Sequence, residues 1–400
     1  MKPLNVLACL ALLAACRGDA PAAQQLEQAE LEALVDTLMP QVAEAAGLEF
    51  RTRPAVAVRS KEQVRTFLLA KLAKELPPER IEGLVASYRL LGLLPDSLDL
   101  STLFVDLYTE QIAGFYEPDS SMLYAVGGGN RLQLKGILAH ELTHALQHQY
   151  VALDSILADR ADADRLAAAQ AVLEGQATVV MLMVLAPDRD ILSDDGVWEL
   201  LRSQLTGPTA DLEVFNSAPL VIRTGLIFPY LEGATFMRWW INNRGREQPY
   251  GAAMPTSTEQ ILHPSRLQQG DAPVALAFED DASDVIHEDT FGEFEMDVLR
   301  SGLAGIEAVA TDLALGWGGD RLRVYRTPGG PALVWYSVWD EPRFATNFRE
   351  RVVAGLPKVA RPGYRVLISE VPVGAHAGVQ VVVAPEGWSR WSALPTVVAR

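Results

Sequence analysis

The chain has 400 residues, of which 49% are hydrophobic and 21% charged. This length predicts one large domain or two medium ones, and the hydrophobic content excludes a wholly disordered chain. Acidic residues outnumber basic ones by 51 to 34, and the net charge of -17 would repel a phosphate backbone, so we expect no nucleic-acid partner. Both cysteines, Cys9 and Cys16, lie near the N-terminus, which excludes a disulfide framework or a cysteine zinc site elsewhere.

The first residues have the layout of a secretion signal. Lys2 precedes an apolar run from Leu4 to Leu13, which suits the core of a signal peptide and is too short to cross a bilayer. The run ends in Leu-Ala-Ala-Cys, which resembles a bacterial lipobox in which Cys16 is lipidated and becomes the new N-terminus. An ordinary secretory signal cut near Ala15, or a buried N-terminal helix, are the alternatives.

These features predict where the protein resides. We expect a signal peptide over 1–16, then a flexible tether and an N-terminal helix over 17–47. Beyond this point no uncharged run is long enough to span a membrane, and the most apolar stretch, 175–187, indicates a buried helix. The sequence therefore predicts an extracytoplasmic body, anchored by lipid to a bacterial membrane, in the periplasm or at the cell surface.

Hydrophobic periodicity predicts the elements up to residue 266. An amphipathic helix over 24–47 contains Pro40, which is expected to kink it, and a short strand follows over 54–59. The segment 114–130 alternates apolar and polar residues around a Pro-Asp-Ser-Ser turn, which predicts a hairpin. Further helices are predicted over 61–76, 79–93, 102–112, 131–149, 160–186, 195–204 and 226–243.

The composition changes near residue 266, and the alternation of strands and helices beyond it predicts a separate α+β module over 267–400. Helices are predicted over 290–304 and 342–354, and strands near 321–326, 332–338, 364–370 and 377–383. The glycine-rich segment 316–321 precedes a strand and lacks the Lys of a phosphate loop, so it predicts a tight turn and no nucleotide site. The fold class is therefore α+β, with a mostly helical first domain that carries a small hairpin.

The segment His-Glu-Leu-Thr-His at 140–144 carries the clearest chemical signal. His140 and His144 lie four residues apart, so on a helix both project from one face and can reach one metal ion. Glu141 would then lie within reach of a water at that ion. The flanking residues are apolar at helical spacing, and burying these polar side chains without partners would be costly. Two hydrogen-bonded core histidines are the alternative.

A catalytic zinc normally has three protein ligands and one open position, so a third ligand is expected. His148 lies about 12 Å along the helix from the first histidine, too far to share one ion. An extended metzincin pattern requires a glycine where this chain has Gln147. Glu174 interrupts an otherwise uncharged helical stretch, and coordination would remove the cost of burying it. The alternative is an ion pair with Arg165 or Arg223.

This arrangement resembles the gluzincins, the His-Glu-x-x-His metallopeptidases whose third ligand is a glutamate on a following helix. The resemblance covers residues 100–265. In detail the chain is similar to uncharacterised bacterial metallopeptidase-like lipoproteins. The shared segments are Gly-Phe-Tyr-Glu-Pro (114–118), Pro-Thr-Ser-Thr-Glu-Gln (255–260) and Gly-Trp-Gly-Gly-Asp-Arg (316–321).

The resemblance implies a fold, a cofactor and roles for named residues. It implies a zincin-like catalytic domain over 48–266, with Zn²⁺ bound by His140, His144 and Glu174 and with Glu141 as the general base. The hairpin at 114–130 matches the edge strand on which such peptidases bind extended substrates. The expected partner is therefore a peptide or protein substrate.

Two departures from the family refine this expectation. Many gluzincins carry an acid four residues after the ligand glutamate, where it supports a histidine. This chain has Thr178 there, so the residues around the ligands must differ. Residues 127–130 read Gly-Gly-Gly-Asn and contain no acid that could anchor a free amino terminus, which favours an endopeptidase.

The sequence therefore predicts zinc-dependent hydrolysis of peptide bonds in the bacterial cell envelope. A second donor must stabilise the oxyanion beside zinc, and Tyr230 and His263 are the main candidates for this catalytic role, ahead of Arg223 and Tyr124. Two other functions remain open. One is a non-catalytic, zinc-stabilised envelope lipoprotein for assembly or binding, which the intact Glu141 disfavours; the other is a zinc amide hydrolase acting on a non-protein substrate.

Overall fold

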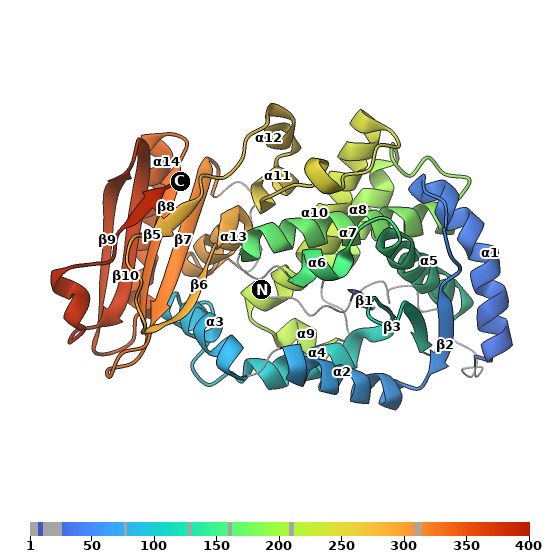
Figure 1. Cartoon of the computed structure of the whole chain (residues 1–400), viewed down its shortest axis with the longest axis horizontal. Helices are drawn as coiled ribbons and strands as arrows, with labels where there is room; N and C mark the ends of the chain where they lie inside the picture. Colours follow the sequence, from blue (N-terminus) through green and yellow to red (C-terminus); the bar gives the residue numbers. More distant parts are fainter. Residues whose placement is uncertain are drawn as a thin grey trace.

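The protein is an α+β structure in which helices predominate, as the sequence predicts. The computed structural model describes residues 7–10, 26–75, 78–126, 130–158, 162–207, 212–306, 309 and 314–400. The predicted lipobox with Cys16, the tether over 17–25 and Gly127–Gly129 lie outside these residues. Figure 1 shows a five-stranded sheet at one end of the long axis, a helical body in the middle, and α1 (Gln28–Ala46) at the other end.

A four-stranded sheet lies beside α1, with the strand order β1-β3-β4-β2. The predicted hairpin is present: β3 (Ile112–Glu117) and β4 (Met122–Val126) pair antiparallel around a turn. On the far side of β4, β2 (Ala55–Arg59) pairs in parallel. The sequence did not predict β1 (Leu7–Leu10), which lies within the expected signal segment and pairs antiparallel with the outer edge of β3.

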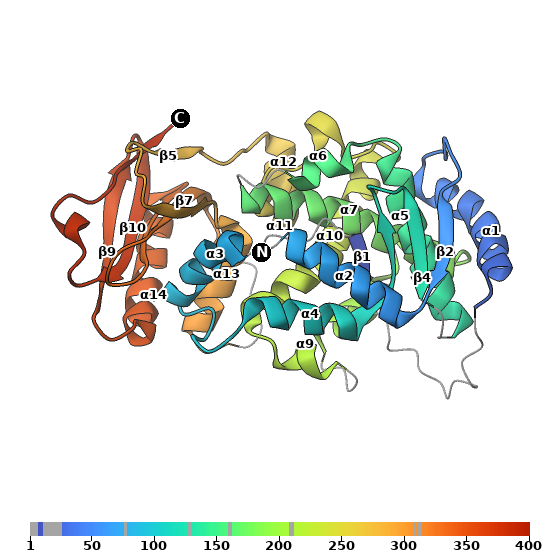
Figure 2. The ribbon, with the colours of Figure 1, turned by 60° about the horizontal axis from the view of Figure 1, so that its bottom comes forward.

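The predicted N-terminal helix is present: α1 contains Pro40 and ends at a left-handed Gly47. Most other helices predicted before residue 266 also form, and the helix predicted over 226–243 begins six residues earlier, at Leu220. Figure 2 shows α2 and α4 side by side along one flank of the body, with α9 against α4. These surrounding helices are α2 (Lys61–Glu75), α3 (Pro78–Leu90), α4 (Leu100–Gln111), α6 (Leu153–Ala158), α8 (Asp195–Thr206), α9 (Glu213–Ser217), α11 (Thr258–Leu262) and α12 (Pro264–Gln269).

Three long helices form the centre of the body: α5 (Arg131–His148), α7 (Ala163–Leu185) and α10 (Leu220–Arg244). Among the described helices, α7 alone is long and apolar enough to cross a membrane. However, 78% of its most apolar window is buried inside the protein. The helix is therefore a core helix, as the apolar run 175–187 predicts.

Two glycines let α7 and α10 approach closely. A Cβ added at Gly175 would lie 2.2 Å from the carbonyl carbon and oxygen of Gly233. A Cβ added at Gly233 would lie 2.1 Å from the Ala171 carbonyl oxygen. No larger side chain fits at either position, so the helix crossing next to Glu174 depends on the missing Cβ atoms.

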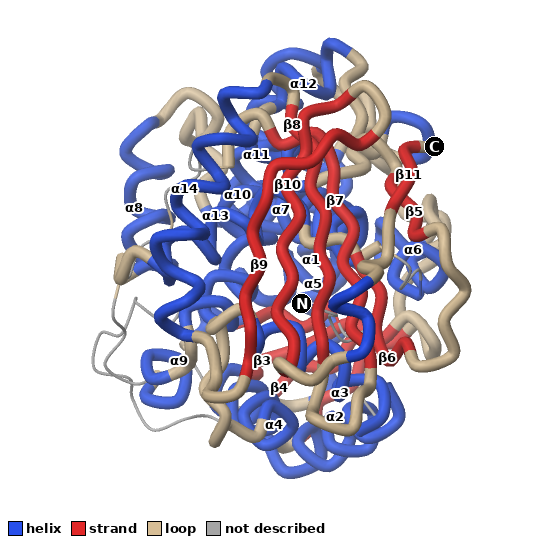
Figure 3. The backbone as a smooth tube through the Cα atoms, turned by 90° about the vertical axis from the view of Figure 1, so that its left-hand side faces the viewer, coloured by secondary structure: helices blue, strands red, loops and turns tan. Residues whose placement is uncertain are grey.

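The C-terminal part is an antiparallel sheet of five strands in the order β6-β7-β8-β10-β9, seen face-on in Figure 3. Its central strand, β8 (Ala332–Trp339), is buried at every position, so both faces of the sheet are covered. The helices α13 (Gly292–Leu303) and α14 (Pro342–Val359) pack against it. The remaining strands are β6 (Val285–Asp289), β7 (Trp317–Tyr325), β9 (Tyr364–Val373) and β10 (His376–Pro385), and β5 (Leu276–Phe278) pairs separately with β11 (Val397–Ala399).

One prediction for this part is wrong. The glycine-rich segment 316–321 is not a tight turn, because β7 already begins at Trp317 and Gly316 alone precedes it. Two observations explain the strand: the Trp317 side chain is fully buried, and Asp320 accepts hydrogen bonds from the Trp317 and Trp335 indoles at 3.1 and 2.9 Å. Burial of large side chains therefore outweighs the glycine content of this segment.

The C-terminal part also fixes the start of α7, the helix that carries Glu174. In Figure 1, α13 lies between the five-stranded sheet and the central helices. Asp289 at the end of β6 accepts the backbone N–H of Ala163 at 2.8 Å, and Asp164 accepts the backbone N–H of Thr258 at 3.0 Å. The first turn of α7 is therefore anchored by Asp289 of the C-terminal part and by Thr258 of α11.

Candidate metal centre

The motif helix α5 is positioned by a cap and by burial. Asn130 accepts the Gln133 backbone N–H at 2.8 Å, and the Gln133 side chain accepts the Asn130 N–H at 3.3 Å, which forms a complete capping box. All residues from 138 to 147 are buried. The helix is therefore held at its start and packed along its length, so the motif side chains have little freedom.

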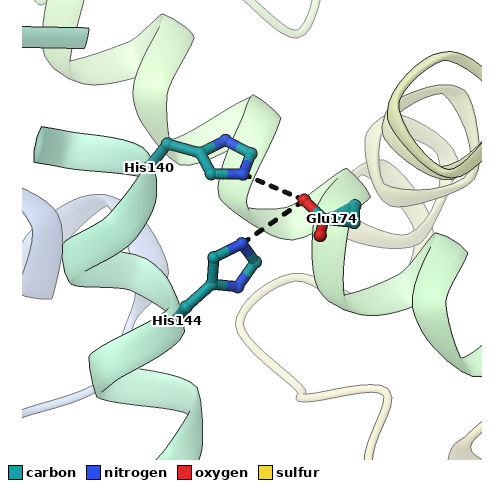
Figure 4. Close-up of side chains that lie close together, drawn as sticks. All are labelled: His140, His144 and Glu174. Atoms are coloured by element: carbon teal, nitrogen blue, oxygen red, sulfur yellow. Dashed lines mark hydrogen bonds and ion pairs between the residues drawn. The ribbon is translucent and has the colours of Figure 1, made fainter. Parts of the chain in front are cut away.

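The structure brings the three expected ligands together. Figure 4 shows the Glu174 carboxylate of α7 pointing between the two imidazoles of α5. The Glu174 Oε2 atom lies 2.9 Å from His140 Nε2 and 3.3 Å from His144 Nε2. The alternative of an ion pair with an arginine is not seen among the described residues, where the partners of Glu174 are the two histidines.

Within the group of His140, His144 and Glu174, the charge of one side chain shifts the pKa of another. Burial lowers the pKa of the His144 imidazole, but the adjacent Glu174 carboxylate outweighs burial and raises it to about 9. Burial would raise the pKa of Glu174, yet the charge on His144 and the hydrogen bond from His140 lower it to about 2. Burial lowers the pKa of His140. Without a metal, one proton on His144 compensates the buried carboxylate.

The residues fit a metal ion. Their three ligand atoms lie within 4.8 Å of one another, and all three side chains are buried. A cation at this position would supply the positive charge that a proton otherwise provides, and it would satisfy the carboxylate. Two imidazoles and one carboxylate suit zinc and other divalent first-row metals, and three ligands leave a position open.

Glu141 follows the ligand His140 on α5 and lies beside strand β3. Its side chain is completely buried, and its charge helps to raise the pKa of His144. A Cβ added at Gly114 in β3 would lie 4.0 Å from the Glu141 Cγ and only 2.8 Å from the Ile137 side chain. The glycine therefore lets β3 pass directly beside the Glu141 side chain.

The two candidate oxyanion donors have different surroundings. Tyr230 of α10 is buried and stacks against His140, with ring centroids 5.9 Å apart and planes inclined by 28°. His263 lies between α11 and α12, and its Nε2 atom is 3.1 Å from Glu293 Oε1 on α13. The structure thus places Tyr230 against the metal group, whereas the hydrogen bond of His263 joins it to α13.

Sequence reasoning missed Gln147. Its Oε1 atom lies 2.9 Å from His144 Nδ1, on the side of the ring opposite Glu174. The sequence feature that could have indicated Gln147 was its position, as an amide three residues after the second histidine in a buried helix. Thr178 does not take the place of the missing acid, because its hydroxyl has no hydrogen-bond partner among the described residues. The residues around the ligands differ as expected: the Gln147 amide, and not an acid at position 178, hydrogen-bonds to a ligand histidine, His144.

His148 does not join the ligand group, as its spacing predicts. Its Nδ1 atom lies 2.8 Å from the hydroxyl of Tyr116, and the two rings meet edge to face. Tyr116 belongs to β3, so this contact ties the last turn of α5 to the strand that passes Glu141. His148 therefore helps to fix the strand against the helix.

The comparisons with known proteins identify no family for the whole chain. Residues 260–383 match DUF8575, a domain family of unknown function. No curated protein matches the chain. A solved structure from Chloroflexus aurantiacus is similar at 19% identity and a TM-score of 0.39, over 63% of this chain and 93% of that chain; that protein is described as having a novel fold and is assigned only provisionally as a hydrolase.

Proposed function

We propose that this protein is a zinc endopeptidase of the bacterial cell envelope. The observation that carries the proposal is the position of Glu141, a buried carboxylate that follows the first histidine of a three-residue metal group and lies beside a strand. A purely structural zinc site normally has four protein ligands and needs no carboxylate beside it. A catalytic site has three ligands and requires a base at this place.

The residues of the chain then have separate roles. The two histidines and Glu174 would hold zinc, which would supply a Lewis acid to polarise a carbonyl group and activate water. Glu141 takes a proton from the attacking water and gives it to the leaving amine. Tyr230, which stacks on His140, is the better placed of the two candidates to donate a hydrogen bond to the developing oxyanion.

A peptide substrate is supported by the edge of β3 that faces away from β4. This edge pairs with an extended stretch of chain, Leu7–Leu10, in which Cys9 lies opposite Gly114. Neighbouring strands lie about 4.8 Å apart, so a peptide in the same place would run close to Glu141. The stretch belongs to the expected signal peptide, whose removal would open the edge to a substrate by strand addition.

The test is a comparison of wild type with Glu141→Gln in cleavage of a proteome-derived peptide library. We expect the zinc-loaded mature wild type to cleave internal peptide bonds. Glu141→Gln keeps the shape of the side chain but removes the base, so turnover should fall by about 10²-fold or more while bound zinc is unchanged.

Glu199→Gln, on the exposed side of α8, is the matched control and should cleave like wild type. Equal cleavage by Glu141→Gln would exclude Glu141 as the base. A wild type that binds zinc but cleaves no peptide in the library would contradict the peptidase proposal.

A further inference from the structure

A chain of side-chain amides leads away from the metal group. It begins at His144, whose Nδ1 atom lies 2.9 Å from Gln147 Oε1. The Gln147 amide continues to Gln176 Oε1 at 2.9 Å, and the Gln176 amide continues to Gln248 Oε1 at 2.8 Å. These glutamines come from α5, from α7 and from the segment after α10, so the chain joins three parts of the fold.

The inner end of this amide chain has a fixed direction. Gln147 Nε2 lies 2.9 Å from the Leu173 backbone oxygen, which can only accept a hydrogen bond. The nitrogen of the Gln147 amide must therefore face Leu173, and its oxygen must face His144. Because that oxygen can only accept, His144 must donate from Nδ1, which leaves Nε2 as the atom for a metal.

The outer end fixes the same direction independently. Gln248 Nε2 lies 3.1 Å from the backbone oxygens of Ala46 and Arg246, so its nitrogen faces these two acceptors. Its oxygen then accepts from Gln176, and the Gln176 oxygen accepts from Gln147. The Tyr250 hydroxyl also donates to this oxygen. Both ends fix the same direction of hydrogen bonding. No amide in the chain can therefore flip its oxygen and nitrogen without placing one acceptor against another.

We infer that Gln147 is a positioning residue and that the amide chain from Gln147 through Gln176 to Gln248 presets His144 as a metal ligand. The chain keeps a hydrogen on Nδ1 and directs Nε2, the atom that a metal would bind, toward Glu174. His140 lacks such support, since its Nδ1 atom has no hydrogen-bond partner among the described residues. The support of His144 is uncharged, in contrast to the carboxylates that often orient metal-bound histidines.

The inference rests on the proposed metal site and deepens it. Partners that orient a ligand histidine usually change metal affinity by 10- to 100-fold, and we expect this range for the loss of Gln147. The chain ends on the carbonyl oxygen of Ala46 in the last turn of α1. The N-terminal helix α1 therefore supports the metal site indirectly, through the hydrogen bonds of the amide chain.

The experiment uses the full mature chain, labelled with ¹⁵N at histidine. In metal-free wild type the Nδ1–H of His144 should exchange slowly with water, because Gln147 accepts it inside the core. In Gln147→Leu this exchange should become faster, and zinc affinity, measured by competition with a chelator, should fall by about 10- to 100-fold. Gln41→Leu on α1 is the matched control, since within the described part of the chain its amide bonds to Thr37 of the same helix.

Gln248→Leu gives a second test at the half-buried outer end of the chain, where a fold defect is least expected. It should speed the same exchange and weaken zinc binding less than Gln147→Leu does. Unchanged exchange and affinity in these variants would overturn the inference, even if wild type cleaves peptides. The expected changes in a protein without peptidase activity would uphold the inference and contradict the proposed function alone.

Discussion

The ligand group illustrates how much a single buried charge reveals. Glu174 could be predicted from sequence because it stands alone in an apolar helix, where a carboxylate without a compensating partner is costly. The structure supplies that partner in the two histidines. Gln147 could not be assigned in the same way, since an uncharged amide in a helix has many ordinary explanations. Its role depends on which backbone oxygen faces it, and that is a property of the fold.

Two other buried carboxyl groups, those of Glu259 and Glu293, should make the stability of the fold depend on pH. Burial and mutual repulsion raise the pKa of Glu259 to about 8, and burial also raises that of Glu293 to about 8. The unfolded value is near 4.5, so the folded protein holds more protons between pH 4.5 and 8, and stability falls as pH rises through this range. We expect the melting temperature to drop by several degrees between pH 6 and pH 9.

The double variant Glu259→Gln/Glu293→Gln should remove this contribution. Both side chains then stay neutral, so the melting temperature at pH 9 should exceed that of wild type and the difference should shrink toward pH 6. Glu213→Gln, at an exposed position, should follow wild type throughout. A double variant whose melting temperature parallels wild type from pH 6 to pH 9 would contradict the raised pKa values.

At the scale of elements, the helices and the hairpin follow from periodicity, but their contacts do not. The sequence predicts α5, α7 and α10 as helices, and only the structure shows that α7 lies against both of the others. The sequence did contain a sign of the contact between α7 and α10. This sign is the pair of glycines at 175 and 233, each of which follows a glutamate. Without the facing helix, a glycine within a helix does not reveal what approaches it. The strand β1 gave no signal either, because its apolar run is equally typical of a signal peptide.

The close crossing of α7 and α10 makes Gly175→Ala a destabilising change. The new methyl group would meet the backbone of Gly233 at 2.2 Å, so the helices must separate. We expect a loss of about 1–3 kcal/mol in the free energy of unfolding, measured by denaturant titration. Because Glu174 is the neighbouring residue, zinc affinity should fall as well.

Gly387→Ala provides the control for this change, since a Cβ there meets nothing within 4 Å. That variant should match wild type in both stability and zinc affinity. If Gly175→Ala unfolded at the same denaturant concentration as wild type, the close approach of the two helices would not hold in solution.

For the whole molecule, the sequence predicts the α+β class and the change of composition near residue 266, but not how the parts join. A continuous cluster of buried apolar side chains extends from the helical body into the five-stranded sheet, and the Phe228 and Phe294 rings within it lie 4.1 Å apart. The carboxylates of Asp289 and Asp164 accept backbone hydrogen bonds that anchor the start of α7 in the same region. Such contacts join residues that lie far apart in the sequence, such as Ala163 and Asp289, which no local pattern encodes.

The location of the molecule is a prediction of the sequence alone. If Cys16 carries the lipid, Cys16→Ser should move the full-length protein from the detergent phase to the aqueous phase after phase separation of cell extracts. Cys9→Ser is the matched control and should remain with the membrane, because Cys9 would be lost with the signal peptide. A Cys16→Ser protein that stays in the detergent phase would exclude lipidation at this residue.

The central claim is that His140, His144 and Glu174 together hold one metal ion. The most direct test is the zinc content and affinity of purified wild type beside Glu174→Ala, with Glu232→Ala as the control because its carboxylate pairs with Arg202 instead. We predict about one zinc per chain in wild type and in the control, and an affinity lower by more than about 100-fold in Glu174→Ala. One tightly bound zinc in Glu174→Ala, with unchanged affinity, would contradict the site described above.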